Sequence, residues 1–197
     1  MAFQVDLGPC EGVRCADTGE LIPPELVKAG REKEVAELKA FGVFEFIRGQ
    51  DALRFKQVRC RWVDRLKRGV CRSRFVAMEF ANSIRDDLYA GTPLLGVVRL
   101  LFSEAATHPR GRAPTKLLSA ADISCAFMHA KYDGDLVLAL PAGMAPPGAK
   151  AKLVGAINGT RKARQLWQRF VEQRMKEGGF VPTKGCPQLY LHPQRNI

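Results

Sequence analysis

The chain has 197 residues, 46% of them apolar and 26% charged, with a formal net charge of +11. This apolar content excludes a disordered chain, because it supplies enough side chains for the core of one domain. No apolar run reaches the ~18 residues of a membrane span, and the first residues lack the layout of a signal peptide. We therefore expect a cytoplasmic or nuclear protein with no membrane partner. The positive charge favours a polyanionic partner such as nucleic acid.

The six cysteines and three histidines include no CxxC pair and no histidine at a metal-ligand spacing from a cysteine. A zinc site is therefore not expected. Cys10 and Cys15 are close enough in the sequence to form a disulfide. The alternative is a set of reduced intracellular thiols, which six cysteines in a chain of this length favour.

The first part of the chain combines a tail, a helix and a strand. Residues 1–24 carry Gly, Pro and scattered charge without periodicity, which predicts a flexible tail. Apolar residues at helical spacing over 25–41 predict a helix that Gly30 interrupts and Gly42 ends. The short aromatic and β-branched segment 43–47 predicts a strand.

Residues 54–80 alternate basic and apolar positions on both sides of Gly69. This pattern predicts an antiparallel hairpin with arginines on one face and apolar side chains on the other. The basic face has two interpretations, a surface for phosphate groups or a solvated surface without a partner.

The second half continues with further helices and strands. Apolar spacing predicts a helix over 94–107 and a basic helix over 160–177. Strands are predicted before Asp122, over 136–140 and over 188–192, and a loop rich in Gly and Pro is predicted over 141–149. This order of elements predicts an α+β fold with mostly antiparallel pairing.

Asp122 follows an apolar segment and precedes Ile, Ser, Cys, Ala and Phe. A carboxylate at the end of a strand can hold a hard divalent cation such as Mg²⁺ through its oxygen atoms. The alternative is that Asp122 caps the turn or helix that follows it. The local sequence leaves both interpretations open.

Eight stretches between about residues 31 and 192 carry a family resemblance through their order. They are FGVFEFI (41–47), CRWVDRLKRG (60–69), CRSRFVAMEF (71–80), VVRLLFSEAA (97–106), AADISCAFMHA (120–130), LVLALPAGM (136–144), VGAINGTRKARQLW (154–167) and GGFVPTKGCPQLYL (178–191). The succession resembles the reverse transcriptase domain of copia-type retrotransposons. The family counterparts are an FGVW-like element, CRWVxKxKxxG, KARLVAxG, RxLL, LDVxxAFLNG, VYMxxP, KALYGLKQxPRxW and GFxxSxxDxCLY.

The resemblance implies that residues 25–197 are the N-terminal part of a reverse transcriptase domain. The implied fold is the fingers and part of the palm of a right-hand polymerase, an antiparallel sheet with helices packed on one side. The fingers hairpin would span about 54–80, and the palm strand with Asp122 about 115–130. The implied activity is RNA-directed DNA synthesis with two Mg²⁺ ions. The implied partners are an RNA or DNA template–primer, a dNTP and the rest of a Pol polyprotein.

The family match also implies roles for single residues. Asp122 would be the first metal-binding carboxylate, with Ile123 beside it in the metal site. Phe127 would pack under the incoming sugar, although core packing is an alternative role. The positions implied to contact the nucleotide are Arg72, Arg74, Ile123, Phe127 and Lys162. The basic residues predicted to contact nucleic acid are Arg59, Arg61, Lys67, Arg68, Arg161 and Arg164. We expect Asp122 to face the basic hairpin across a cleft.

The sequence departs from the family pattern in two places. In the GLKQxPRxW motif, Lys162 replaces the glutamine that helps to position the nucleotide, and Arg164 replaces the proline. The family also continues into a hairpin bearing YVDD, whose aspartates complete the metal site, whereas this sequence stops at Ile197. We therefore expect this chain alone to be inactive or nearly so. The alternatives are a non-catalytic nucleic-acid-binding remnant or a decaying transposon fragment.

Overall fold

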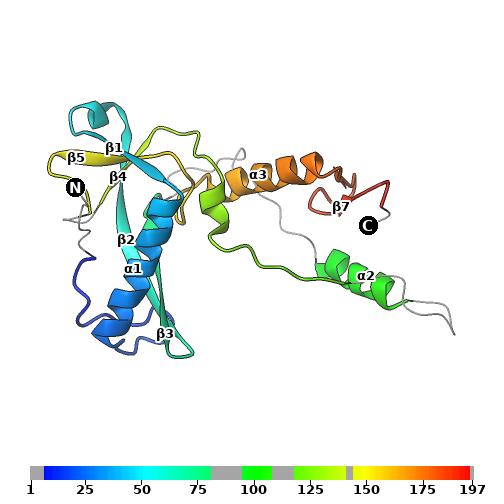
Figure 1. Cartoon of the computed structure of the whole chain (residues 1–197), viewed down its shortest axis with the longest axis horizontal. Coiled ribbons are helices and arrows are strands. Elements are labelled where there is room, and N and C mark those ends of the chain that lie inside the picture. The colour runs from blue at the N-terminus through cyan, green and yellow to red at the C-terminus, as the bar shows by residue number, and fades with distance from the viewer. Residues whose placement is uncertain (1–6, 81–94, 108–117, 141–143, 196–197) are drawn as a thin grey trace. The chain divides into compact units, whose positions relative to one another are not determined.

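The structure, a computed structural model, describes residues 7–80, 95–107, 118–140 and 144–195 (Figure 1). Its elements are α1 (Pro24–Ala40), β1 (Phe44–Arg48), the 3-10 helix η1 (Asp51–Arg54), β2 (Lys56–Lys67), β3 (Val70–Ala77), α2 (Leu95–Ala106), the 3-10 helix η3 (Ala126–His129), β4 (Leu136–Ala139), β5 (Ala149–Leu153), α3 (Ala163–Glu177), β6 (Val181–Pro182) and β7 (Tyr190–Leu191). The fold class is α+β, as the order of elements predicts.

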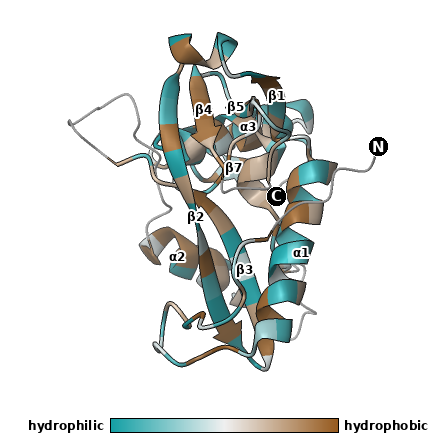
Figure 2. Ribbon diagram, turned by 90° about the vertical axis from the view of Figure 1, so that its left-hand side faces the viewer, coloured by the Kyte–Doolittle hydropathy of each residue, from teal (hydrophilic) through white to brown (hydrophobic). Residues whose placement is uncertain are grey.

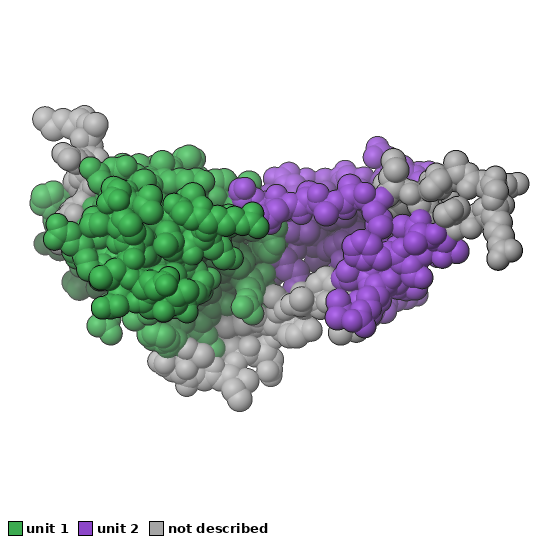
Figure 3. Space-filling model, turned by 90° about the horizontal axis from the view of Figure 1, so that it is seen from below, with its two compact units in different colours: residues 1–88, 125–167 green, residues 89–124, 168–197 purple. Residues whose placement is uncertain are grey.

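The chain divides into two compact units, coloured separately in Figure 3. The first unit contains residues 1–88 and 125–167, and the second contains residues 89–124 and 168–197. The chain therefore leaves the first unit after the hairpin, returns to it near Cys125 and leaves it again within α3.

The first unit is built on a five-stranded sheet with the strand order β1-β5-β4-β2-β3. All pairs are antiparallel except β2 and β4, which run parallel from Lys56 opposite Leu136 to Arg59 opposite Ala139. The prediction of an antiparallel sheet is therefore wrong for this pair, and the sheet is mixed. Parallel neighbours need a long crossover connection, and the excursion of the chain through the second unit provides one.

The predicted hairpin is present as β2 and β3. Arg68 and Gly69 form its turn with φ angles of 51° and 75°. Two consecutive residues with positive φ are typical of the tight hairpin turns whose twist matches that of the flanking strands. Hydrophilic and hydrophobic positions alternate along both strands in Figure 2, as the period of two in the sequence predicts.

Helix α1 is continuous through Gly30, so the predicted interruption is wrong. A Cβ atom on Gly30 would lie 2.5 Å from the Cys71 carbonyl oxygen and 2.7 Å from Ser73 Oγ. Glycine is therefore required here by the close approach of α1 to β3. The helix begins with Pro24, a residue favoured at the first helical position, and Gly42 follows its end with a φ of 56°.

Replacing Gly30 with alanine is expected to lower the free energy of unfolding by about 1–3 kcal/mol, because the added methyl group overpacks this contact. Chemical denaturation of the two proteins measures the effect. Gly96→Ala in α2 is the matched control, since its Cβ atom would meet nothing within 4 Å. That substitution should stabilise the helix slightly. Equal effects of the two substitutions would contradict the packing role of Gly30.

The main core of the first unit lies between α1 and the sheet. Its largest fully buried side chains include Leu38 of α1, Phe75 of β3, Leu138 of β4 and Leu153 of β5. Strand β5 begins at the end of the stretch 141–149, which we predict as a loop from its Gly and Pro content. The prediction therefore misses this strand. Its sequence AKAKL alternates, which was the available signal.

Residues 7–23 are packed against the hairpin, so the prediction of a flexible tail is wrong for this part. Cys15 and Ile22 are only 3% and 2% exposed. Arg14 forms a β-bridge with Leu21, and the Ala16 N–H donates to the Asp64 carbonyl at 2.9 Å. Cys10 and Cys15 are free thiols rather than a disulfide.

The second unit contains α2, most of α3 and the small β6–β7 hairpin. Helix α2 occupies the predicted range, and none of its residues is buried. The strand predicted before Asp122 is not seen, since residues 118–123 have no regular secondary structure. Residues 115–117 and the predicted loop at 108–114 lie outside the described residues. None of the described helices has the length and apolarity needed to span a membrane.

Candidate nucleic-acid interface

One face of the β2–β3 hairpin is lined with basic side chains, which we call the basic face. Alternate residues of a strand point to opposite sides, so the basic residues at every second position of β2 and β3 lie on the same side, together with Val63, Val70 and Val76. The exposed members are Arg59, Arg61, Arg65 and Lys67 of β2, and Arg72 and Arg74 of β3. Arg68, another residue predicted to contact nucleic acid, is exposed in the turn between the strands. The structure thus brings together all hairpin residues predicted to contact phosphates.

The strand register places like charges together on this face. Arg65 is directly opposite Arg72, and Val63 is opposite Arg74. Like charges at opposed positions destabilise a sheet by roughly 0.2–1 kcal/mol. Among the described residues, Arg65 is the single member of the basic face with an ion pair, to Asp17 at 3.1 Å. The face therefore keeps a strong positive potential that a polyanion would relieve.

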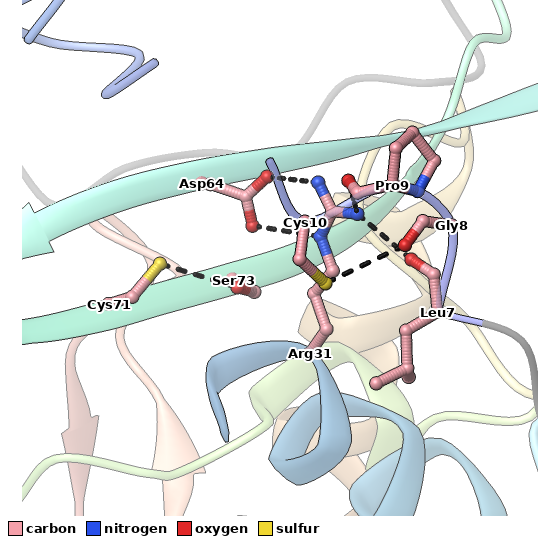
Figure 4. Close-up of polar contacts among 8 residues, drawn as sticks. All are labelled: Leu7, Gly8, Pro9, Cys10, Arg31, Asp64, Cys71 and Ser73. Carbon is pink, nitrogen blue, oxygen red and sulfur yellow. Dashed lines mark hydrogen bonds and ion pairs between the residues drawn. The ribbon is translucent and has the colours of Figure 1, made fainter. Parts of the chain in front are cut away.

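The opposite face of the hairpin is fixed to α1 by a buried ion pair (Figure 4). Arg31 donates to Asp64 through Nη2 at 2.7 Å and through Nε at 3.3 Å. Its Nη1 also donates to the carbonyl oxygens of Leu7 and Pro9, at 2.9 and 3.0 Å. The guanidinium lies 5.1 Å from the centre of the Trp62 ring. Arg31 therefore joins α1, β2 and the N-terminal segment, and both charges are satisfied by hydrogen bonds.

An acidic residue of α1 satisfies one backbone N–H group on the free edge of β3. The Phe75 N–H donates to Glu34 Oε1 at 3.0 Å. Burial raises the pKa of the Glu34 carboxyl above its ordinary value, although the Phe75 N–H opposes this shift. An edge strand normally presents unpaired N–H groups to solvent, and here the helix satisfies one of them. The hairpin is thus held rigidly on one side while its basic face stays accessible.

Asp122 and Ile123 are exposed residues of the second unit. Arg72 and Arg74 belong to the first unit, so the expectation that Asp122 faces them stays a prediction. Among the described residues, no group of three or more His, Cys, Asp or Glu side chains is placed to hold a metal ion.

Phe127 lies half-buried in η3, close to a contact that the sequence prediction misses. Cys125 is the residue before this helix, with a φ of 52°, and its thiol donates to Glu37 Oε2 of α1 at 3.0 Å. Burial and the Glu37 carboxylate raise the pKa of the Cys125 thiol to about 11. The Cys125 thiol is therefore unreactive. Its hydrogen bond attaches the segment that re-enters the first unit to α1.

The basic residues before and within α3 have separate environments. Lys162 is half-buried and forms an ion pair with Asp133 at 3.0 Å. Arg164 is exposed, and the Arg161 N–H donates to Glu79 Oε2 at 2.9 Å. Glu79 also accepts a hydrogen bond from Lys56 Nζ at 2.8 Å. Glu79 therefore joins the beginning of β2 to the beginning of α3, a role that no local sequence pattern indicates.

The Glu79 junction makes stability depend on pH. Burial acts to raise the pKa of Glu79, but the Lys56 and Arg161 contacts outweigh it and hold the pKa below its ordinary 4.5. A carboxyl whose pKa is lower in the folded state contributes stability that is present above pH 4.5 and lost as the pH falls through the folded value. Glu79→Gln should therefore cost about 1–3 kcal/mol at neutral pH.

Urea denaturation of wild type and Glu79→Gln across acidic and neutral pH tests this expectation. The difference in free energy of unfolding should shrink as the pH falls from 4.5 through the lowered pKa of folded Glu79, because below that value both proteins are neutral at position 79. Glu177→Gln is a control, because Glu177 pairs with Arg174 on the exposed surface of α3. A Glu79→Gln effect that is constant with pH would contradict the ionic character of the junction.

No family model, curated protein or solved structure matches this chain.

Proposed function

We propose that the chain is a portion of an RNA-directed DNA polymerase of the copia type. In this proposal the β2–β3 hairpin is the part of the fingers that binds nucleotide and nucleic acid. The observation that carries the proposal is the basic face, with its six exposed basic side chains and a single ion pair among the described residues. The stretches CRWVDRLKRG and CRSRFVAMEF supply all of these residues except Arg59.

A right-hand polymerase has separate fingers and palm, and the proposal assigns the hairpin to the fingers and Asp122 to the palm. These residues lie in different units, whereas Phe127 and Lys162, also assigned to the nucleotide site, lie in the unit of the hairpin. The mixed α+β class is also compatible with such a fold.

The chemistry proposed for the hairpin is recognition of phosphate groups. Arginine presents a planar fork of N–H donors that matches two phosphate oxygens, and it remains charged at every physiological pH. Arg72 and Arg74 are the residues proposed to contact the triphosphate, and their exposure on one face suits such a role. The remaining basic side chains would neutralise phosphates of the template–primer and release counterions.

The test is formation of a ternary complex by the whole chain. A labelled RNA-template/DNA-primer is titrated with the protein in the presence of Mg²⁺, with the dNTP that pairs with the next template base or with a mismatched dNTP. The proposal predicts tighter retention with the matched dNTP, and loss of this gain in Arg72→Gln/Arg74→Gln and in Asp122→Asn. Arg48→Gln on β1 is the control. Equal retention with both dNTPs would contradict a polymerase site.

A second candidate function is binding of nucleic acid without catalysis. The observation that favours it is the Lys162–Asp133 ion pair, because Lys162 occupies the position at which the family places a nucleotide-positioning glutamine. Under this alternative, the same titration would show binding that weakens steeply with salt and does not respond to any dNTP.

A further inference from the structure

Three aromatic rings from distant parts of the sequence meet on the first unit. Phe41 follows the last residue of α1, His129 ends η3, and Trp167 lies in α3. Contacts between their rings join the three elements. We propose that the three rings form a stacking platform for an unpaired nucleobase. This inference rests on the proposed binding of nucleic acid and adds a base contact to the phosphate contacts of the hairpin.

The ring geometry places His129 at the centre of the platform. The Phe41 and His129 ring centres are 4.7 Å apart and meet edge to face at 72°. The His129 and Trp167 ring centres are 6.3 Å apart with the planes tilted by 50°. Both separations fall in the range of favourable aromatic pairs. His129 is exposed, Phe41 is 37% exposed and Trp167 is half-buried, so part of the cluster reaches solvent.

The charges near the rings match a nucleic-acid strand. Arg164 is exposed on α3 one turn before Trp167, and residues three apart lie on the same side of a helix. Aromatic rings flanked by cations are the usual arrangement for binding single strands, because the rings stack on bases while the cations neutralise phosphates. The residues therefore fit a single-stranded template better than an uncharged ligand.

Stacking on a base and packing between elements predict different results. If the rings only join α1, η3 and α3, their loss lowers stability and affects every ligand equally. If they stack on a base, their loss removes the preference for a strand that carries bases. An oligothymidylate and an abasic oligonucleotide of the same length separate these cases, because they share their phosphates.

The experiment measures binding of both oligonucleotides to the whole chain by fluorescence anisotropy at one salt concentration. Wild type is expected to bind the oligothymidylate about 5- to 100-fold more tightly than the abasic strand. His129→Ala and Phe41→Ala should lose most of this ratio and keep their affinity for the abasic strand. Trp167→Phe should keep the preference for the oligothymidylate, since this variant retains an aromatic ring at position 167. Phe46→Ala is the control, because Phe46 is 44% exposed on β1 and away from the cluster in sequence and element.

The outcomes separate the inference from the proposed function. Equal binding of both strands by wild type overturns the platform and leaves phosphate binding by the hairpin intact. Loss of the ratio in Phe46→Ala also overturns it, since the preference would then not depend on the three rings. If neither strand binds, the proposed function and the platform fail together. Thermal unfolding of each variant shows whether it is folded at the temperature of the titration.

Discussion

Replacing Arg31 with methionine is expected to lower the free energy of unfolding by about 3–5 kcal/mol, because it leaves the Asp64 carboxylate buried without its partner. Asp64 and Arg31 side chains are 4% and 6% exposed, so solvent cannot replace the lost contact. The carbonyl oxygens of Leu7 and Pro9 also lose their donor. Urea denaturation monitored by circular dichroism measures the change.

Two further variants make this result specific. Arg48→Met breaks an exposed pair with Asp51 and should cost less than about 1 kcal/mol. The double replacement Arg31→Met/Asp64→Leu removes both buried charges and should recover much of the loss, since an apolar pair avoids the desolvation cost of an isolated ion. A double variant as unstable as Arg31→Met would show that the lost stability arises from packing and not from the unpaired charge.

Replacing both Arg72 and Arg74 with glutamine is expected to weaken binding of the template–primer and reduce its dependence on salt. Each neutralised phosphate contributes about 0.7–0.9 to the slope of log affinity against log salt concentration, so the slope should fall by about 1–2. Anisotropy titrations at several salt concentrations measure it. Stability should change little, because removal of the Arg65–Arg72 repulsion is favourable while loss of Arg74 removes a positive charge that favours the ionised form of Glu34.

The matched control removes two positive charges from elsewhere. Arg48 and Arg174 are exposed arginines of β1 and α3, each paired with an acidic neighbour. Their double replacement by glutamine gives the same net charge as the hairpin variant. If both variants lower the salt slope equally, binding depends on overall charge and not on the basic face.

The hairpin could be predicted from the sequence because neighbouring residues alone determine its strands and its turn. The alternation of basic and apolar residues over 54–80 determines which side chains are exposed, and Gly69 marks the turn. The same holds for α1, whose apolar spacing and flanking Pro24 and Gly42 define its range. Arg72 and Arg74 therefore lie on an exposed face as predicted.

The features that prediction missed depend on contacts between distant segments. Parallel pairing of β2 with β4 arises only once the chain has passed through a second unit. Gly30 is a weak helix residue by local propensity, and only the approach of β3 explains it. One signal was available: Arg31 lies on the apolar side of α1, where a charged residue needs a buried partner.

The candidate site also combines features that neighbouring residues determine with features that depend on distant contacts. The alternating pattern predicted the exposed arginines, whereas the strand before Asp122 was inferred from a short apolar run, which does not distinguish a strand from other structures. Glu79 and Glu37 bind partners more than eighty positions away in the sequence. A single sequence gives no means of pairing such residues.

Binding to the basic face is tested most directly by chemical modification of arginine. The whole chain is treated with a guanidinium-selective dicarbonyl reagent with and without template–primer, and each modified residue is quantified by mass spectrometry. We predict that Arg61, Arg72 and Arg74 are protected in the complex while Arg48 and Arg174 react as before. Formation of the complex without protection of the hairpin arginines would contradict the account.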